Sequence, residues 1–567
     1  MKKALATIAI LGAAGAAAFF AFQKIGPSGS FSAATLLPPE TIVMIEAPDL
    51  KTSAERWQKT AIFRIANEPE VQTFFQRPLA AMRNTVLEDT LRRLHQVSLD
   101  QGFVAMTSIE DNNPVILMGI RYSGSREELQ GLVARAKAQA QTVNPTGKLD
   151  LIQHGPYEIE SFTYEKTTVA GVYAGQWYFI SNQVDLLKAT LDRLTQPAGS
   201  NLEGSEIFRK CMAALPKKAD LRTYIRTDWL AEKYTTLMQA AGTPLNKEQL
   251  EELRQVKGVA VGTVMEGPLI REVAYVYAPE MPILPVLNGS TLALTSPDTL
   301  IYYGNALNFP ENFDFKNYPA NDPVSVALRS FLKNVDSEVP LSDLKKAFGP
   351  DFAFILDWKK QSISPSMAVV VTVKDAPLAF KFARSFFRDW KGVENGAVAF
   401  WRLPRPNLAL PLAVAPTAAM TDTHLIVGID SHTVDAILEK AIATVSRSNE
   451  SKTLILTPAF EKAYASVHKP AQGLIYVDTR VLFERIYETF RGMAVYANMI
   501  PGASEYFDFS RLPTTDSISQ HLLPNIVSTA QVENGILVEA TGALSVQGTV
   551  LLKLGLAGAL YAKQLRQ

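Results

Sequence analysis

The chain has 567 residues, enough for roughly two to four domains. Hydrophobic residues make up 47% of it and charged residues 20%, a composition that excludes a disordered chain. Its 56 basic residues balance 56 acidic ones, so the sequence shows no basic stripe of the kind typical of nucleic-acid binders, which leaves only local patches made by folding. The single cysteine, Cys211, excludes an internal disulfide and a zinc–thiolate site.

The N-terminus carries an export pattern. Lys2 and Lys3 precede an uncharged, mostly apolar run at 4–22, which is just long enough to cross a bilayer. The flanking lysines predict an inner-membrane anchor with the body on the periplasmic side. We favour an uncleaved anchor with a flexible tether at 26–32. The alternatives are a cleaved signal peptide, which would release the body into the periplasm, and a buried core helix.

Beyond the tether, two stretches show the same order of expected elements. Each opens with a turn and a buried strand, at 39–45 and 297–303. Two more strands follow, at 102–106 and 115–120 in the first stretch and at 351–355 and 367–373 in the second. A helix comes next, opened by a capping box at 125–128 in the first stretch and covering 376–390 in the second.

The strongest match between the stretches lies further along the chain. Phe208 corresponds to Phe460 and Tyr224 to Tyr476, both at a separation of 252 residues. Each stretch closes on a strand, at 269–277 and 536–541. The proline-rich segment 278–289 is typical of a linker between them.

Several strands alternate apolar and polar side chains, as 221–226 does, which is typical of an antiparallel sheet with one face covered. We therefore predict an α+β fold with two tandem copies of a mostly antiparallel sheet covered by helices. The expected boundaries are 1–32 for the signal or anchor helix and linker, 33–282 and 283–545 for the two copies, and 546–567 for a short C-terminal helix or tail. The tail is too short to span a bilayer, so we expect it to dock on the body, with a place at the membrane surface as the alternative.

The opening of the first copy, Leu37-Pro38-Pro39-Glu40-Thr41, resembles the start of a family of exported bacterial proteins known as a domain of unknown function. Members of that family carry Leu-Pro-x-Asp/Glu-Thr before a hydrophobic strand. The likeness extends over much of 35–282, whereas the second copy lacks the leading Leu-Pro. It implies an exported location and this fold, and it supplies no catalytic residue.

Catalytic and cofactor motifs are absent from the sequence: it has no phosphate-binding loop, nucleophile elbow or His-Glu-x-x-His pair. His424 and His432 flank an expected strand that separates them by roughly 25 Å, too far to share a metal ion. Asp430 or Ser431 is expected to cap the following helix, and Cys211 is expected to pack in the core, because Ala463 occupies the matching position in the other copy. The acids Asp185 and Asp435 are expected to complement helix dipoles rather than act as an acid–base pair. We predict no catalytic, metal-binding or cofactor-binding residue and no cofactor.

The most partner-like segment holds Phe400, Trp401, Arg402 and Arg405 among prolines. The alternative interpretation is a hairpin whose two aromatic rings point into the core. Our leading functional hypothesis is a non-enzymatic, membrane-anchored envelope protein that binds a protein partner or an apolar ligand such as a lipid. The alternative hypotheses are a hydrolase with its site at the junction of the two copies and a purely structural spacer.

Overall fold

The structure is a computed structural model, and it describes residues 32–77, 99–110, 113–124, 126–143, 146–165, 167–196, 200–228, 254–307, 323–360, 362, 364–395, 398–403, 415–445, 453–497 and 508–545. The expected N-terminal helix, the C-terminal tail and the capping-box residue Ser125 lie outside these residues. None of the helices in these ranges combines the length and the hydrophobicity that crossing a bilayer requires.

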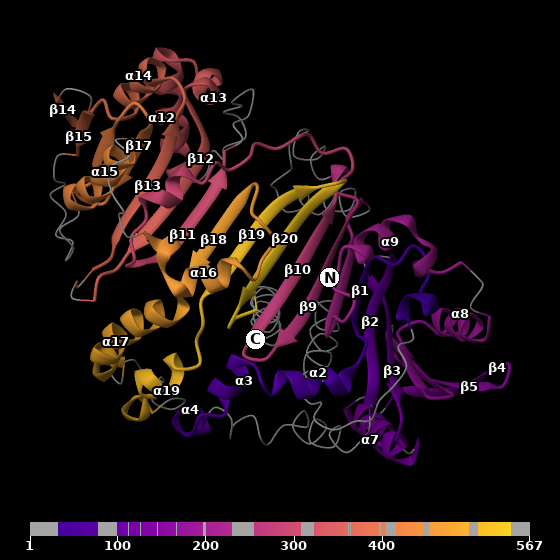
Figure 1. Cartoon of the computed structure of the whole chain (residues 1–567). Helices are drawn as coiled ribbons and strands as arrows, with labels where there is room; N and C mark the ends of the chain where they lie inside the picture. Colours follow the sequence, from indigo (N-terminus) through magenta and orange to yellow (C-terminus); the bar gives the residue numbers. More distant parts are fainter. Residues whose placement is uncertain are drawn as a thin grey trace.

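The fold is α+β, and its described strands form one antiparallel sheet of 20 strands (Figure 1). The first half contributes β1 (Val43–Ala47), β2 (Leu99–Glu110), β3 (Asn113–Tyr122), β4 (Lys148–His154), β5 (Tyr157–Tyr164), β6 (Thr167–Ala174), β7 (Trp177–Ser181), β8 (Leu221–Arg226), β9 (Gly258–Glu266) and β10 (Leu269–Tyr277). The second half contributes β11 (Thr299–Ala306), β12 (Phe348–Asp357), β13 (Ser366–Val373), β14 (Lys391–Asn395), β15 (Val398–Arg402), β16 (Thr417–Met420), β17 (His424–Gly428), β18 (Gly473–Val477), β19 (Asn525–Val532) and β20 (Gly535–Gly542).

The strand order across the sheet is β4-β5-β6-β7-β3-β2-β1-β8-β9-β10 in the first half, followed by β20-β19-β18-β11-β12-β13-β17-β16-β15-β14 in the second. The halves meet where β10 pairs with β20, from Ile270 opposite Gly542 to Tyr277 opposite Gly535. We call this pairing the seam. Counted outward from the seam, both halves place their strands in the same order of appearance along the chain.

Helices cover both faces of the sheet, which differs from the one-sided cover expected from the sequence. On one face of the first half, η1 (Ala33–Leu36), α8 (Val184–Thr195), η2 (Leu202–Gly204) and α9 (Glu206–Ala213) share a core with the strands. On the other face lie α2 (Leu50–Trp57) and α7 (Arg126–Val143). Successive side chains of a strand point to opposite faces, so Trp177 and Phe179 enter the first core and Tyr178 the second.

The second half has the same two layers. One face carries η3 (Ser290–Leu294), α15 (Ser431–Val445), η6 (Leu454–Leu456) and α16 (Pro458–Tyr464). The other carries α12 (Pro323–Glu338), η5 (Leu341–Asp343), α13 (Leu344–Ala347) and α14 (Ala376–Phe386).

A helical bridge crosses from one half to the other near the turn between β9 and β10 (Figure 1). It is made by α3 (Ala61–Ala66) and α4 (Pro69–Phe74) of the first half and by α17 (Thr479–Ala497), η7 (Phe509–Arg511) and α19 (Thr515–Ser519) of the second. Glu70 accepts hydrogen bonds from the backbone and side chain of Thr514, and His521 contacts Glu68. Apolar side chains from both halves pack beneath these polar contacts.

Candidate functional site

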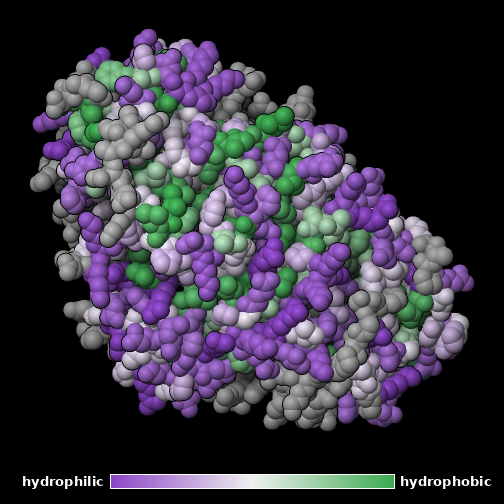
Figure 2. Space-filling model, viewed as in Figure 1, coloured by the Kyte–Doolittle hydropathy of each residue, from purple (hydrophilic) through white to green (hydrophobic). Residues whose placement is uncertain are grey.

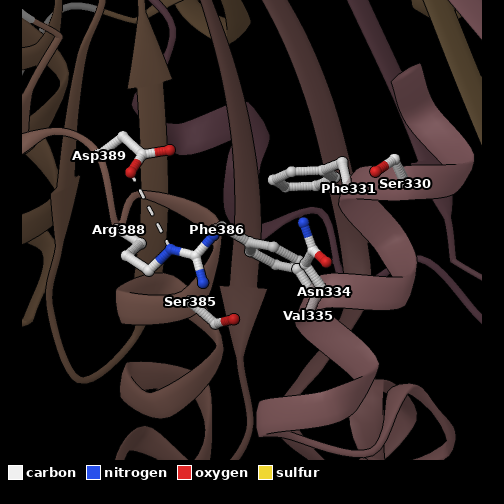
Figure 3. A pocket seen from close by; sticks show the side chains of 8 residues that line it. All are labelled: Ser330, Phe331, Asn334, Val335, Ser385, Phe386, Arg388 and Asp389. Atoms are coloured by element: carbon white, nitrogen blue, oxygen red, sulfur yellow. Dashed lines mark ion pairs between the residues drawn. The ribbon is translucent and has the colours of Figure 1, made fainter.

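A hollow between α12 and α14 is the best candidate for a binding site (Figure 3). Phe331, Asn334 and Val335 are spaced three and four residues apart, which places them on one side of α12. Opposite them, α14 supplies Ser385 and Phe386. The hollow has a volume of about 330 Å³, and its remaining lining residues are Ser330, Arg388 and Asp389.

Aromatic rings form the apolar part of this hollow. Phe331 stacks on Phe386 with ring centroids 5.9 Å apart and an angle of 26° between the planes. Phe386 also contacts Phe382, which is fully buried in the core, so the stack rests on the body of the second half. Phe331 remains 40% exposed. An aromatic side chain that is supported from below and open to solvent can receive an apolar group from a partner.

Polar groups surround the aromatic stack. The guanidinium of Arg388 donates a hydrogen bond of 2.9 Å to Glu338 at the end of α12, and its Nε lies 4.0 Å from Asp389 (Figure 3). The lining residues hold one carboxylate, Asp389, and no histidine, cysteine or lysine. They therefore hold no pair of carboxylates for acid–base chemistry.

A second hollow, of about 410 Å³, lies where the loop after β12 approaches α17 and α19. It is lined by Trp358, Ser362, Glu484, Arg485, Glu488, Thr489, Thr515 and Asp516. The acids of α17 are already engaged, because Arg480 donates to Glu484 at 3.2 Å and Thr515 contacts Glu488. In the described part of the chain, no group of three or more His, Cys, Asp or Glu residues is placed to hold a metal ion.

The alternative hypothesis, a hydrolase, places its site at the junction of the two copies, which is the seam. It contains two buried carboxylates, Glu272 and Glu539. Glu539 is opposite Val273 in the register and Glu272 is opposite Ala540, so the two acids point to opposite faces of the sheet. Glu539 binds Arg271 at 3.0 Å, and Glu272 accepts a hydrogen bond of 2.6 Å from Ser545. The seam therefore does not bring these carboxylates together for acid–base chemistry.

The segment that looked most partner-like from the sequence is mainly structural. Phe400 and Trp401 lie in β15, between β14 and β16, and not at a hairpin tip. Trp401 is only 6% exposed and packs against Phe380 and Phe387, with ring centroids 5.8 and 5.5 Å away. Phe400 is half-buried on the opposite face. Burial makes Trp401 inaccessible to a partner, so of the four residues only Arg402 is exposed in the structure, and Arg405 lies outside the described residues.

The other residues singled out from the sequence have structural surroundings. Asp430 accepts a hydrogen bond of 2.7 Å from the backbone N–H of Thr433 and so caps α15. Cys211 is fully buried, and burial raises the pKa of its thiol to about 12. His424 is buried beside Thr423, whereas His432 is exposed. Asp185 forms an exposed ion pair with Lys188 in the first turns of α8.

The hollow at Phe331 and Phe386 was not anticipated from the sequence. The helix at 376–390 was predicted, but nothing in the sequence indicated that Phe331 would stack on it from another helix. Helix pairing between distant segments leaves no local pattern, so the available signal was limited to the phenylalanines of α14.

Comparisons with known proteins add little to this description. No family model matches the chain, and no curated protein matches it. Two crystal forms of TP0453, forms III and I, are similar at 11% identity with TM-scores of 0.27 and 0.26. Both alignments cover 45% of this chain, and they cover 83% and 82% of the TP0453 chains.

Proposed function

We propose that this chain is a non-enzymatic, membrane-anchored envelope protein whose body binds a protein partner at the hollow formed by α12 and α14. The observation that carries the proposal is the exposed Phe331 ring stacked on Phe386 beside the polar groups of Arg388 and Asn334. Protein interfaces concentrate binding energy in aromatic anchors surrounded by polar groups that exclude water. The polar rim favours a protein partner over a purely apolar ligand.

A photo-crosslinking experiment tests the binding site. Benzoylphenylalanine replaces Phe331 in the full-length chain, which is then irradiated in the cells that make it. The control places the same probe at Phe75, which is 42% exposed against 40% for Phe331 and belongs to the other half. Discrete protein adducts from position 331 that are absent from position 75 support the proposal. Identical adduct patterns at the two positions, or lipid adducts alone, contradict it.

Membrane anchoring is part of the proposal and rests on the apolar run at 4–22 with its flanking lysines. The intact mass of the mature protein shows whether the segment is retained. An anchored chain stays in the membrane fraction after alkaline carbonate washing, and protease added to spheroplasts digests its body. Recovery of the full-length chain from the cytosol contradicts this part of the proposal.

We also propose that residues 33–282 and 283–545 are two copies of one unit that arose by duplication. The order of strands outward from the seam supports this, because each strand of one half has a counterpart in the other. Matching aromatic pairs support it too. Phe208 meets Tyr224 at 5.0 Å between ring centroids and Phe460 meets Tyr476 at 5.2 Å, both edge to face. An experimental structure in which the two halves fail to superimpose would overturn it.

A further inference from the structure

Four exposed basic residues of the first half lie close together in the chain, within residues 209–218. Arg209 and Lys210 lie on the solvent side of α9, and Lys217 and Lys218 lie in the loop that follows it. We call these four residues the basic patch. None of the four side chains forms an ion pair with a residue that the structure describes. The surface over α9 is hydrophilic (Figure 2).

Two acids precede the patch along the chain and offset part of its charge: Glu203 of η2, and Glu206 in the first turn of α9, which stands three and four residues before Arg209 and Lys210, a spacing at which helix side chains are neighbours. Lys217 and Lys218 in the following loop leave the stretch 203–218 with an excess of two positive charges. The matching positions in the second half, 252 residues later, hold Glu461, Lys462, Lys469 and Pro470. The excess of positive charge is therefore specific to the first half.

The first half is also where the chain enters the folded body. Ala33, Ala34, Leu36 and Leu37 are fully buried, and the N–H of Ala33 donates to the carboxylate of Glu46 at 3.0 Å. η1 shares one core with η2 and α9, and the N–H of Leu202 donates to the carbonyl of Leu37 at 2.9 Å. The element that carries the basic patch thus packs in the same core as the first described residues of the chain.

This position limits how far the patch can lie from the membrane. Ten residues separate Phe22, the end of the apolar run, from Ala33. At ~3.3–3.6 Å per residue, even a fully extended segment spans only about 40 Å. If the run at 4–22 anchors the chain as proposed above, η1 stays within about 40 Å of the lipid surface, so the layer that includes α9 is within reach of the bilayer.

We infer that the basic patch is a second membrane contact, which binds the phosphate headgroups of anionic lipids and orients the body with this layer of the first half toward the bilayer. The inference rests on the proposed anchoring, and it commits to a lipid surface as the occupant because of charge complementarity and the short tether. Lysine and arginine side chains near an anionic surface are attracted within about one Debye length of ~8–10 Å. The contact is therefore expected to weaken with added salt.

A spin-label experiment on the full chain tests the contact. The native cysteine is removed by Cys211→Ala, and a label is attached at Ala213→Cys, an exposed position at the end of α9 beside the patch. The matched control is Ala465→Cys, the corresponding exposed position at the end of α16. Each protein is reconstituted into phosphatidylcholine vesicles with and without phosphatidylglycerol, and collisions with a water-soluble nickel chelate are measured.

The inference predicts that nickel accessibility at position 213 falls severalfold when phosphatidylglycerol is present, while position 465 is unchanged. Replacing the four basic residues by glutamate abolishes the fall, and high salt reduces it. If that variant does not fold, Lys217→Gln with Lys218→Gln in the loop provides the same comparison. Equal behaviour at 213 and 465, or protection that survives charge reversal, overturns the inference.

The outcome for the anchor is read separately. If the chain floats with pure phosphatidylcholine vesicles but shows no lipid-dependent protection at position 213, the proposed anchoring is supported and the lipid contact of the basic patch is rejected. If the chain does not float with phosphatidylcholine vesicles, the anchoring is rejected. In that case the same two labels are read after phosphatidylglycerol vesicles are added to the protein, and absence of protection at 213 again rejects the patch.

Discussion

Arg271 of β10 and Glu539 of β20 form an ion pair of 3.0 Å that joins the two halves of the sheet across the seam. Glu539 is the more buried partner, with a side chain 10% exposed against 35% for Arg271. It also accepts a hydrogen bond from the backbone N–H of His468, so one carboxylate holds β20, β10 and the segment after α16 together. Breaking this pair should lower the free energy of unfolding, because the carboxylate of Glu539 would then be buried without its positively charged partner.

Removal of this arginine is expected to destabilise the fold. Arg271→Ala leaves the carboxylate of Glu539 with one donor, which should lower the free energy of unfolding by about 1–3 kcal/mol. The double variant Arg271→Ala/Glu539→Gln should recover part of this loss, because the glutamine keeps an acceptor for His468 without a buried charge. Urea unfolding of both variants measures the difference. A double variant less stable than Arg271→Ala would contradict the prediction that the charge of Glu539 destabilises the fold once the arginine is removed.

The paired aromatic contacts predict equivalent effects in the two halves. Phe208→Ala and Phe460→Ala each remove a buried ring that meets a buried tyrosine, so each should cost about 3–5 kcal/mol. Phe75→Ala, at an exposed ring, is the control and should cost far less. Thermal or urea unfolding gives the values. A large loss at one of the two buried positions and a negligible loss at the other would argue against equivalent roles.

The cysteine should be unreactive in the folded chain. Burial raises the pKa of the Cys211 thiol to about 12, so the thiolate is absent at pH 8. Iodoacetamide is expected to modify Cys211 only after denaturation, as measured by mass spectrometry. The pKa of this thiol is about 8.5 in the unfolded chain and higher in the folded chain. Above about pH 8.5 the unfolded chain therefore loses the proton first, and the free energy of unfolding should fall as the pH rises. Cys211→Ala is the control for that loss and keeps the small residue found at Ala463. Rapid modification of the native protein would contradict the buried position.

His424 predicts a loss of stability on the acid side. Desolvation by burial lowers the pKa of its ring, an effect that the charge of Asp351 partly opposes. The unfolded chain therefore takes up a proton below about pH 6.5 before the folded chain does, and folding becomes less favourable as the pH falls further. His424→Leu should reduce this dependence on pH, because it removes the buried ring that takes up the proton on unfolding. Urea unfolding measured between pH 7 and 5 gives the free energy of unfolding as a function of pH. An equal dependence on pH in the wild type and in His424→Leu would contradict the prediction.

Trp401 and Arg402 are neighbours in β15 with different expected roles. Trp401→Ala removes a ring from the core beneath α14 and should cost about 3–5 kcal/mol of unfolding free energy. Arg402→Ala changes an exposed side chain and should stay within about 0.5 kcal/mol of the wild type. Chemical denaturation compares the two. A Trp401→Ala variant as stable as the wild type would be inconsistent with a core role for this ring.

Much of the local structure could be predicted from the sequence. The last strand of the first half was placed at 269–277, which are the bounds of β10, and a helix was correctly expected to start at Ala376. These predictions succeeded because they depend on neighbours along the chain. Alternation of apolar side chains has a period of two, and a cap or a proline at a helix start acts within one turn. The hairpin partner β9 was missed even so, since glycine and alanine dilute the apolar pattern of GVAVGTVME.

By itself the sequence determined the α+β class, the positions of many strands and helices, and the absence of familiar catalytic motifs. Only the tertiary structure decided that β10 pairs with β20 in one continuous sheet, that Trp401 faces the core and that Phe331 stacks on Phe386. The physical reason is that the N–H and C=O groups along an edge strand are the same whatever its side chains are. The residues of a strand therefore do not determine which other strand it pairs with. Long-range pairing and the packing of distant helices follow from the shape of the whole fold.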